Sequence, residues 1–225
     1  MFDRYWEQLA EAISLRRKVV ISCIPQLTLL AVTCAAAYIL IAIMAVPSGE
    51  KRAYQFFSER GAITILSGII LSAASALSFA TYVVLRFQED HRKLLWILLT
   101  IGFAFLAFDE LLQFHEQLGD AIRRFASSGI FRSWNDVIVI LYGVIAVPMA
   151  IALLPSLIRF PLVAEFFATG FVFYVIHTAI DSIAEPRTTT SIILEESAKI
   201  FSVEFLAMGV FVGFLGALRS TLIAE

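Results

Sequence analysis

Residues 94–116 read LLWILLTIGFAFLAFDELLQFHE, an apolar run with ionisable side chains at its end. The run is long enough to cross the hydrocarbon core of a bilayer, which needs about 20 helical residues. Ionisable residues inside such a segment are costly to bury, so they are functional candidates by default. The stretch therefore predicts a transmembrane helix that carries part of a functional site. Its ionisable residues are Asp109, Glu110, His115 and Glu116.

The composition of the whole chain agrees with a membrane protein. Of 225 residues, 60% are hydrophobic and 16% are charged, with a mean hydropathy of +0.85. These values exclude an ordinary soluble domain. We predict an all-α polytopic bundle with about six transmembrane helices. Besides 94–116, the apolar runs cover 19–46, 62–86, 136–158, 161–184 and 190–217.

The N-terminal segment differs from the apolar runs. Acidic residues precede the first run, which argues against a cleavable signal peptide. Residues 1–18 predict an amphipathic helix in the headgroup plane, with a soluble cap as the alternative. Residues 19–225 then form a single transmembrane domain. The apolar residues of the N-terminal helix recur at three- and four-residue spacing: Phe2, Trp6, Leu9 and Ile13.

Basic residues in short loops predict the orientation of the bundle. Nine on one side against seven on the other favour cytoplasmic N and C termini, in the inner membrane of a bacterium. The nine are Arg4, Arg16, Arg17, Lys18, Arg86, Arg92, Lys93, Arg159 and Arg219. The seven are Lys51, Arg52, Arg60, Arg123, Arg124, Arg132 and Arg187.

Two later apolar runs also contain ionisable residues. His177 and Asp181 come late in the fifth run, whereas Glu195, Glu196 and Lys199 come early in the sixth. Because successive spans cross the membrane in opposite directions, these residues and the acidic end of the third run share one leaflet. On the favoured orientation this is the outer leaflet. The first, second and fourth runs lack such residues in their interiors and are expected to be packing elements.

Helical spacing predicts which of these side chains converge. Asp109, Gln113 and Glu116 lie on one stripe of a continuous helix, while Glu110 and His115 point about 100° and 120° away to either side. On that basis the motif cannot point as a whole into one small site. In the sixth run, Lys199 is expected to pair with Glu195 four residues earlier.

A carboxylate and imidazole set without thiolate favours Fe, Mn or Zn, as one or two ions. Cys23 and Cys34 lie on one predicted helix about 16 Å apart, too far to bond to each other. Asp109 and Glu196 are the candidate catalytic residues, with Glu196 as a carrier of protons. The candidate metal ligands are Asp109, Glu110, His115, Glu116, His177, Asp181, Glu195 and Glu196.

Two paired motifs suggest a family. Asp109-Glu110 and His115-Glu116 form Asp-Glu-x4-His-Glu, and Glu195-Glu196 form a late acidic pair. The chain resembles a group of bacterial multi-pass membrane proteins that carry both motifs. The resemblance covers about the last two thirds of the chain and implies no particular activity.

The residues favour a metalloenzyme that acts on a lipid-soluble substrate, either a non-haem iron oxidoreductase or a metal-dependent hydrolase. Membrane lipid is the expected surrounding partner, and the chain has no feature of a nucleic-acid-binding protein. Two alternatives stay open: a non-catalytic subunit of a larger membrane complex, with partner subunits, and a proton or ion conductor.

Overall fold

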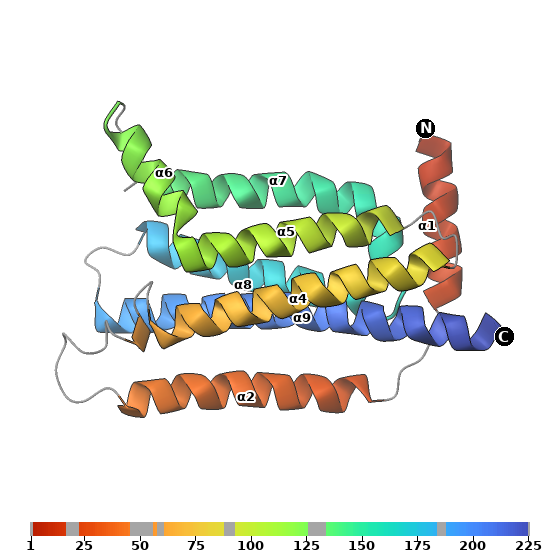
Figure 1. The fold of residues 1–225 in the computed structure, drawn as a ribbon, viewed down its shortest axis with the longest axis horizontal. Helices are drawn as coiled ribbons and strands as arrows, with labels where there is room; N and C mark the ends of the chain where they lie inside the picture. Colours follow the sequence, from red (N-terminus) through yellow and green to blue (C-terminus); the bar gives the residue numbers. More distant parts are fainter. Residues whose placement is uncertain are drawn as a thin grey trace.

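The computed structural model describes residues 2–16, 23–45, 56–57, 61–87, 93–125, 134–183 and 188–224. Every long regular element in these ranges is a helix (Figure 1). The helices are α1 (Phe2–Arg16), α2 (Ile24–Ala45), α4 (Ala62–Phe87), α5 (Lys93–Leu112), α6 (Phe114–Arg123), α7 (Trp134–Leu157), α8 (Val163–Ile183) and α9 (Thr189–Ala224).

Six of these helices, α2, α4, α5, α7, α8 and α9, are long and apolar enough to cross a membrane. The predicted all-α polytopic bundle is therefore confirmed. The predicted first span began at residue 19, but residues 19–22 lie outside the described part of the chain. The third span is shorter than predicted because α5 ends at Leu112. The sixth is longer, since α9 has 36 residues and is about 54 Å long.

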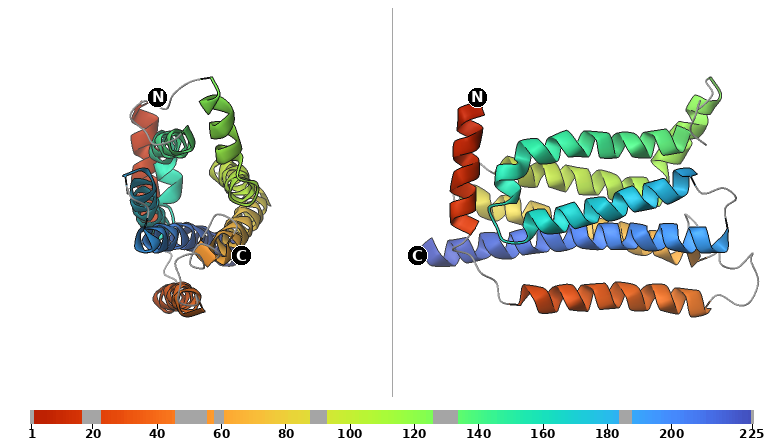
Figure 2. Two further views of the ribbon diagram at one scale, coloured as in Figure 1. Left: turned by 90° about the vertical axis from the view of Figure 1, so that its left-hand side faces the viewer. Right: turned by 180° about the vertical axis from the view of Figure 1, so that it is seen from behind.

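Helix α9 lies at the centre of the bundle. Its residues Val210, Val212 and Ala217 are completely buried. Seen along the bundle, α7 and α8 form one wall beside α9, α4 and α5 form the other, and α2 packs beside α9 and α4 on the outside (Figure 2).

The three spans that were expected to be packing elements differ in how much surface they bury. Helix α4 buries small residues, among them Ser67, Gly68 and Ser78, which allow close packing against its neighbours. Helix α2 buries few residues, and α7 is exposed at every residue from Val144 to Ala152. For α2 and α7 the expectation stays a prediction, since an apolar helix in a bilayer can face lipid on several sides.

Helix α1 lies crosswise at the end of the bundle opposite α6 (Figure 1). The Tyr5 hydroxyl donates a hydrogen bond to the carbonyl oxygen of Ile151 in α7, at 2.9 Å. Trp6 and Ile13 on its apolar face are exposed. The predicted N-terminal helix is therefore present, and its place in the headgroup plane stays a prediction.

The predicted orientation also stays a prediction. Half of the basic residues on which it depends lie outside the described part of the chain: Arg17, Lys18, Lys51, Arg52, Arg60, Arg92, Arg132 and Arg187.

Candidate functional site

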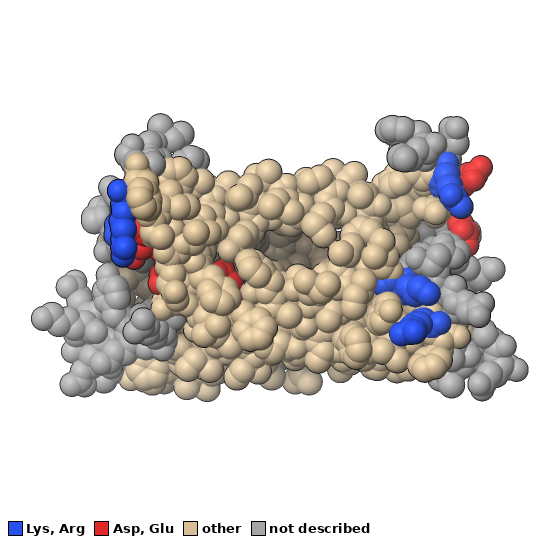
Figure 3. Space-filling view, turned by 45° about the horizontal axis from the view of Figure 1, so that its top comes forward, with Lys and Arg blue, Asp and Glu red and all other residues tan. Residues whose placement is uncertain are grey.

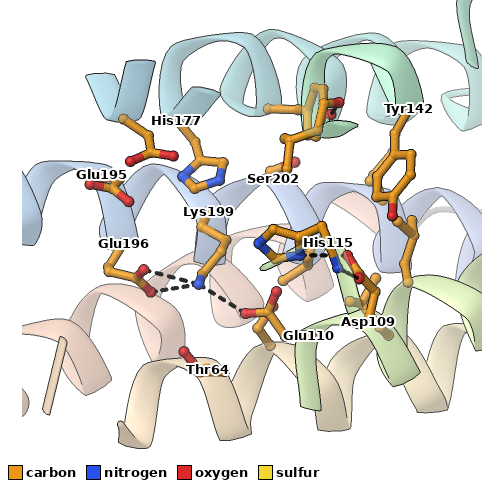
Figure 4. Close-up of a pocket in the computed structure, with 18 of the residues that line it drawn as sticks. Thr64, Asp109, Glu110, His115, Tyr142, His177, Glu195, Glu196, Lys199 and Ser202 are labelled. Carbon is orange, nitrogen blue, oxygen red and sulfur yellow. Dashed lines mark hydrogen bonds and ion pairs between the residues drawn. The ribbon is translucent and has the colours of Figure 1, made fainter. Parts of the chain in front are cut away.

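A polar cavity lies at the end of the bundle where α5 and α8 end and α9 begins. Its volume is about 120 Å³, and side chains from α4, α5, α7, α8 and α9 line it together with Gln113 and His115 (Figure 4). The predicted convergence of the polar residues of the third, fifth and sixth spans is thus confirmed. The ionisable side chains of the lining, apart from two tyrosines, are Asp109, Glu110, His115, His177, Asp181, Glu195, Glu196 and Lys199.

The third span breaks at Gln113, which is part of the cavity lining. Gln113 has φ 57° and ψ 45°, a left-handed backbone conformation that residues other than glycine adopt at a cost of about 1–2 kcal/mol. Its backbone N–H donates to the Asp109 carbonyl oxygen at 2.7 Å, and Gln117 Nε2 donates to the Leu112 carbonyl oxygen at 2.7 Å. These bonds satisfy backbone groups at the end of α5, so that α6 leaves in a new direction.

Because the helix breaks at Gln113, the chain turns and His115 comes into contact with Asp109. The backbone N–H of His115 donates to Asp109 Oδ1 at 2.8 Å, and its Nδ1 lies 2.9 Å from Oδ2. The expectation that His115 points away from Asp109 was wrong, because it assumed one continuous helix through Gln113. Glu116, on the expected stripe, is not among the residues that line the cavity.

Lys199 lies at the centre of the cavity and joins two helices. Its Nζ is 2.9 Å from Glu110 Oε1 on α5, and 2.8 and 3.0 Å from the two carboxylate oxygens of Glu196 on α9 (Figure 4). Lys199 was expected to pair with Glu195, four residues earlier. The structure instead places the ammonium group between Glu196, three residues earlier, and a carboxylate of another helix. This ion-pair cluster is buried, so the loss of one partner would leave an uncompensated charge.

Helix α8 supplies the opposite side of the cavity. Gly170 lies one turn before Tyr174 on α8. Its carbonyl oxygen accepts a hydrogen bond from Ser202 Oγ of α9 at 2.9 Å. A Cβ at Gly170 would come within 2.7 Å of Leu206 Cγ, so glycine allows the close approach of α8 to α9. Farther along this face, the Tyr174 hydroxyl donates to the carbonyl oxygen of Val139, and His177 Nδ1 is buried without a hydrogen-bond partner among the described residues.

Some lining residues had no signal in the sequence. Thr64 and Ser67 are buried on α4 and line the cavity, although the second span has no ionisable residue and was taken for scaffold. Tyr142 of α7 also lines it. A hydroxyl in an apolar span is common, so only the arrangement in space distinguishes these three. Asp136, 2% exposed at the start of α7, is buried outside this lining.

Within the described ranges, no three His, Cys, Asp or Glu side chains are placed to share one ion. Lys199 already forms ion pairs with the carboxylates of Glu110 and Glu196, and His115 contacts both carboxylate oxygens of Asp109. Cys23 and Cys34 are exposed on or beside α2. A metal at this cavity therefore stays a proposal.

Comparison with other proteins gives a family and no activity. No curated protein and no solved structure matches the chain. One family model, the domain of unknown function DUF8692, matches residues 26–213, which include all six candidate spans over most of their length and the whole cavity lining. The chain therefore belongs to the DUF8692 family, with the architecture of a polytopic membrane protein.

Proposed function

We propose that the protein is a membrane enzyme that acts on a lipid-soluble substrate at this cavity, with Fe, Mn or Zn as cofactor. One observation carries the proposal. Five carboxylates and one ammonium group line the same cavity, so its formal charge is −5 + 1 = −4 when the carboxylates are ionised and both histidines are neutral. So much negative charge in a region of low dielectric needs protons or a cation to offset it.

The donors suit the proposed ions in kind. Carboxylate oxygens and imidazole nitrogens are the ligands that Fe, Mn and Zn accept when thiolate is absent. Because Lys199 binds Glu110 and Glu196, the ion would draw on the lining residues of α8 and on Glu195, with rotation of side chains. The buried Nδ1 of His177 supports this, since an imidazole nitrogen without a hydrogen-bond partner is a suitable ligand.

The other histidine suits proton transfer. Asp109 contacts the Nδ1 of His115 and its backbone N–H, which fixes the orientation of the ring. A carboxylate that holds one imidazole nitrogen leaves the other to accept or donate a proton at the substrate. In this proposal His115 is the acid–base residue and Asp109 is the positioning residue, while Glu196 holds Lys199. A bound metal would supply Lewis acidity and a more acidic water.

Elemental analysis of protein purified in detergent without chelator tests the proposal. We expect near-stoichiometric Fe, Mn or Zn in the wild type and its loss in His177→Ala and Glu195→Gln. Glu165→Gln is the matched control, because Glu165 is on α8 but outside the cavity lining. Absence of metal in the wild type, or equal metal in all four proteins, would overturn the metalloenzyme.

A structural role is the second candidate, and one observation favours it. Lys199 links α5 to α9 through a buried ion pair, as a purely structural lock would do. In that case the protein would be a non-catalytic subunit of a membrane complex. The wild type would then contain no metal, and the same substitutions would lower only its thermal stability.

A further inference from the structure

An apolar slot lies between α5 and α7, toward the middle of the bundle from the polar cavity (Figure 3). Every residue of α7 from Val144 to Ala152 is exposed, which is about two and a half turns and includes all sides of the helix. This stretch of α7 is thus largely uncovered, although the carbonyl oxygen of Ile151 within it accepts a hydrogen bond from Tyr5 of α1, and that of Val139 before it accepts one from Tyr174 of α8. Figure 3 shows the surface hollowed at mid-length on this face, beside an acidic residue.

The walls of the slot continue from the walls of the cavity. On α5, Gly102 shares a stripe with Leu106 and Asp109, both of which line the cavity. On α7, Ala146 and Met149 share a stripe with Tyr142, which also lines it. A Cβ at Gly102 would meet nothing within 4 Å, so the space in front of this wall is open.

We propose that this slot binds one acyl chain of a bilayer lipid whose polar group enters the cavity. The inference rests on the proposed function and names its substrate class, an amphiphile with a hydrocarbon chain. The cavity of about 120 Å³ holds only a small polar group, whereas sites for whole small molecules measure about 300–1,000 Å³. The remainder of the substrate must lie outside the cavity, and the slot is the apolar hollow next to it.

The depth of the slot fits a lipid. The cavity is near one end of the spans, and Gly102 lies seven residues from Asp109 toward their middle, a distance of about 10 Å. A chain in the slot would therefore run from the polar end of the bundle toward the bilayer centre, as the acyl chains of the surrounding lipid do. The polar group would lie beside His115 and Lys199.

The width of the slot argues against a protein helix as its occupant. Phe105 of α5 and Tyr142 of α7 contact each other across the gap, with ring centroids 5.5 Å apart. Packed helices need about 8–10 Å between their axes, so a third helix does not fit between α5 and α7 at this level. In this proposal a single hydrocarbon chain lies beside the two rings.

Photocrosslinking tests the slot. The full-length protein would be reconstituted in vesicles of phosphatidylethanolamine and phosphatidylglycerol that contain phosphatidylglycerol with a diazirine at mid-chain. Labelled peptides would be mapped by mass spectrometry. We expect adducts concentrated at residues 102–106 and 142–149. Gly102→Phe should lower this labelling by about ten-fold, equivalent to roughly 1.4 kcal/mol of binding.

Two further variants make the result decisive. Ala146→Trp fills the slot from the opposite wall and should lower labelling equally, whereas Ala76→Phe, on an exposed part of α4, should leave it unchanged. Adducts spread evenly around the bundle, crosslinks to a second copy, or labelling unaffected by both slot variants would overturn the proposal. The metal content of the same samples is a separate readout. A labelled slot without metal would refute the metalloenzyme alone, and metal without slot labelling would refute the lipid site alone.

Discussion

Helix α5 is held to α9 in two different ways at two levels of the bundle. At one level Trp96, 2% exposed, lies against Gly213, where any Cβ would overlap its ring. Fourteen residues away on both helices, about 21 Å, Glu110 binds Lys199. Close packing of apolar side chains thus joins α5 to α9 away from the cavity, and an ion pair joins them at the cavity. The same two helices are therefore joined by close apolar packing at one level and by a charged pair at the other.

The largest effect is expected where charge holds the helices together. Lys199→Met leaves Glu110 and Glu196 buried without their cation, which should cost about 3–5 kcal/mol or prevent folding. Thermal unfolding in detergent would measure the loss. Adding Glu110→Gln and Glu196→Gln to Lys199→Met removes the uncompensated charges and should recover most of the stability. A triple variant as unstable as Lys199→Met would show that the ion pairs are not what the substitution disturbs.

At the apolar level, the expected loss is smaller and has another cause. Gly213→Leu places a side chain in the space occupied by Trp96, and overpacking of this kind costs about 3 kcal/mol at the upper end of its range. Gly102→Leu is the matched control, because a side chain at Gly102 meets open space. Unfolding of both variants in the same detergent checks the difference. Equal stability would mean that α5 and α9 do not interlock at Trp96.

A substitution within the cavity tests whether the Asp109 carboxylate orients the His115 ring. Asp109→Asn keeps the shape of the side chain but removes the charge that holds the His115 ring, with an expected cost of about 1.5 kcal/mol. The ring should lose its fixed tautomer, which nitrogen NMR of labelled histidine detects. Asp120→Asn, an exposed residue of α6 paired with Arg123, is the control and should change neither quantity. An unaltered His115 tautomer in Asp109→Asn would show that Asp109 does not orient the ring.

Much of this arrangement could be predicted from the sequence. Long apolar runs mark the spans, and the alternating direction of the spans places Asp109, His177 and Glu196 at one end without any knowledge of packing. These predictions succeed because they depend on length, polarity and helical period, which the bilayer and the backbone impose locally.

The helix break could not be predicted in the same way. No glycine or proline marks Gln113, and its neighbours are ordinary helix formers. The break depends on contacts with residues before and after it, Asp109 and Gln117, that form only in the folded chain. The slot was equally hidden, since α7 is apolar on all sides and its pattern does not distinguish a face toward lipid from a face toward the bundle.

The smallest predicted effect concerns this break and has the opposite sign. Gln113→Gly should raise stability by about 1 kcal/mol, because glycine adopts a positive φ without the cost that glutamine bears. Leu162→Gly, at the other positive φ among the described non-glycine residues, should act in the same direction, and thermal unfolding of both variants measures it. Gln113→Ala should not stabilise the protein, since alanine bears the same backbone cost. If Gln113→Ala proved the more stable variant, the third span would be continuous, and His115 would lie on the opposite side of the helix from the cavity.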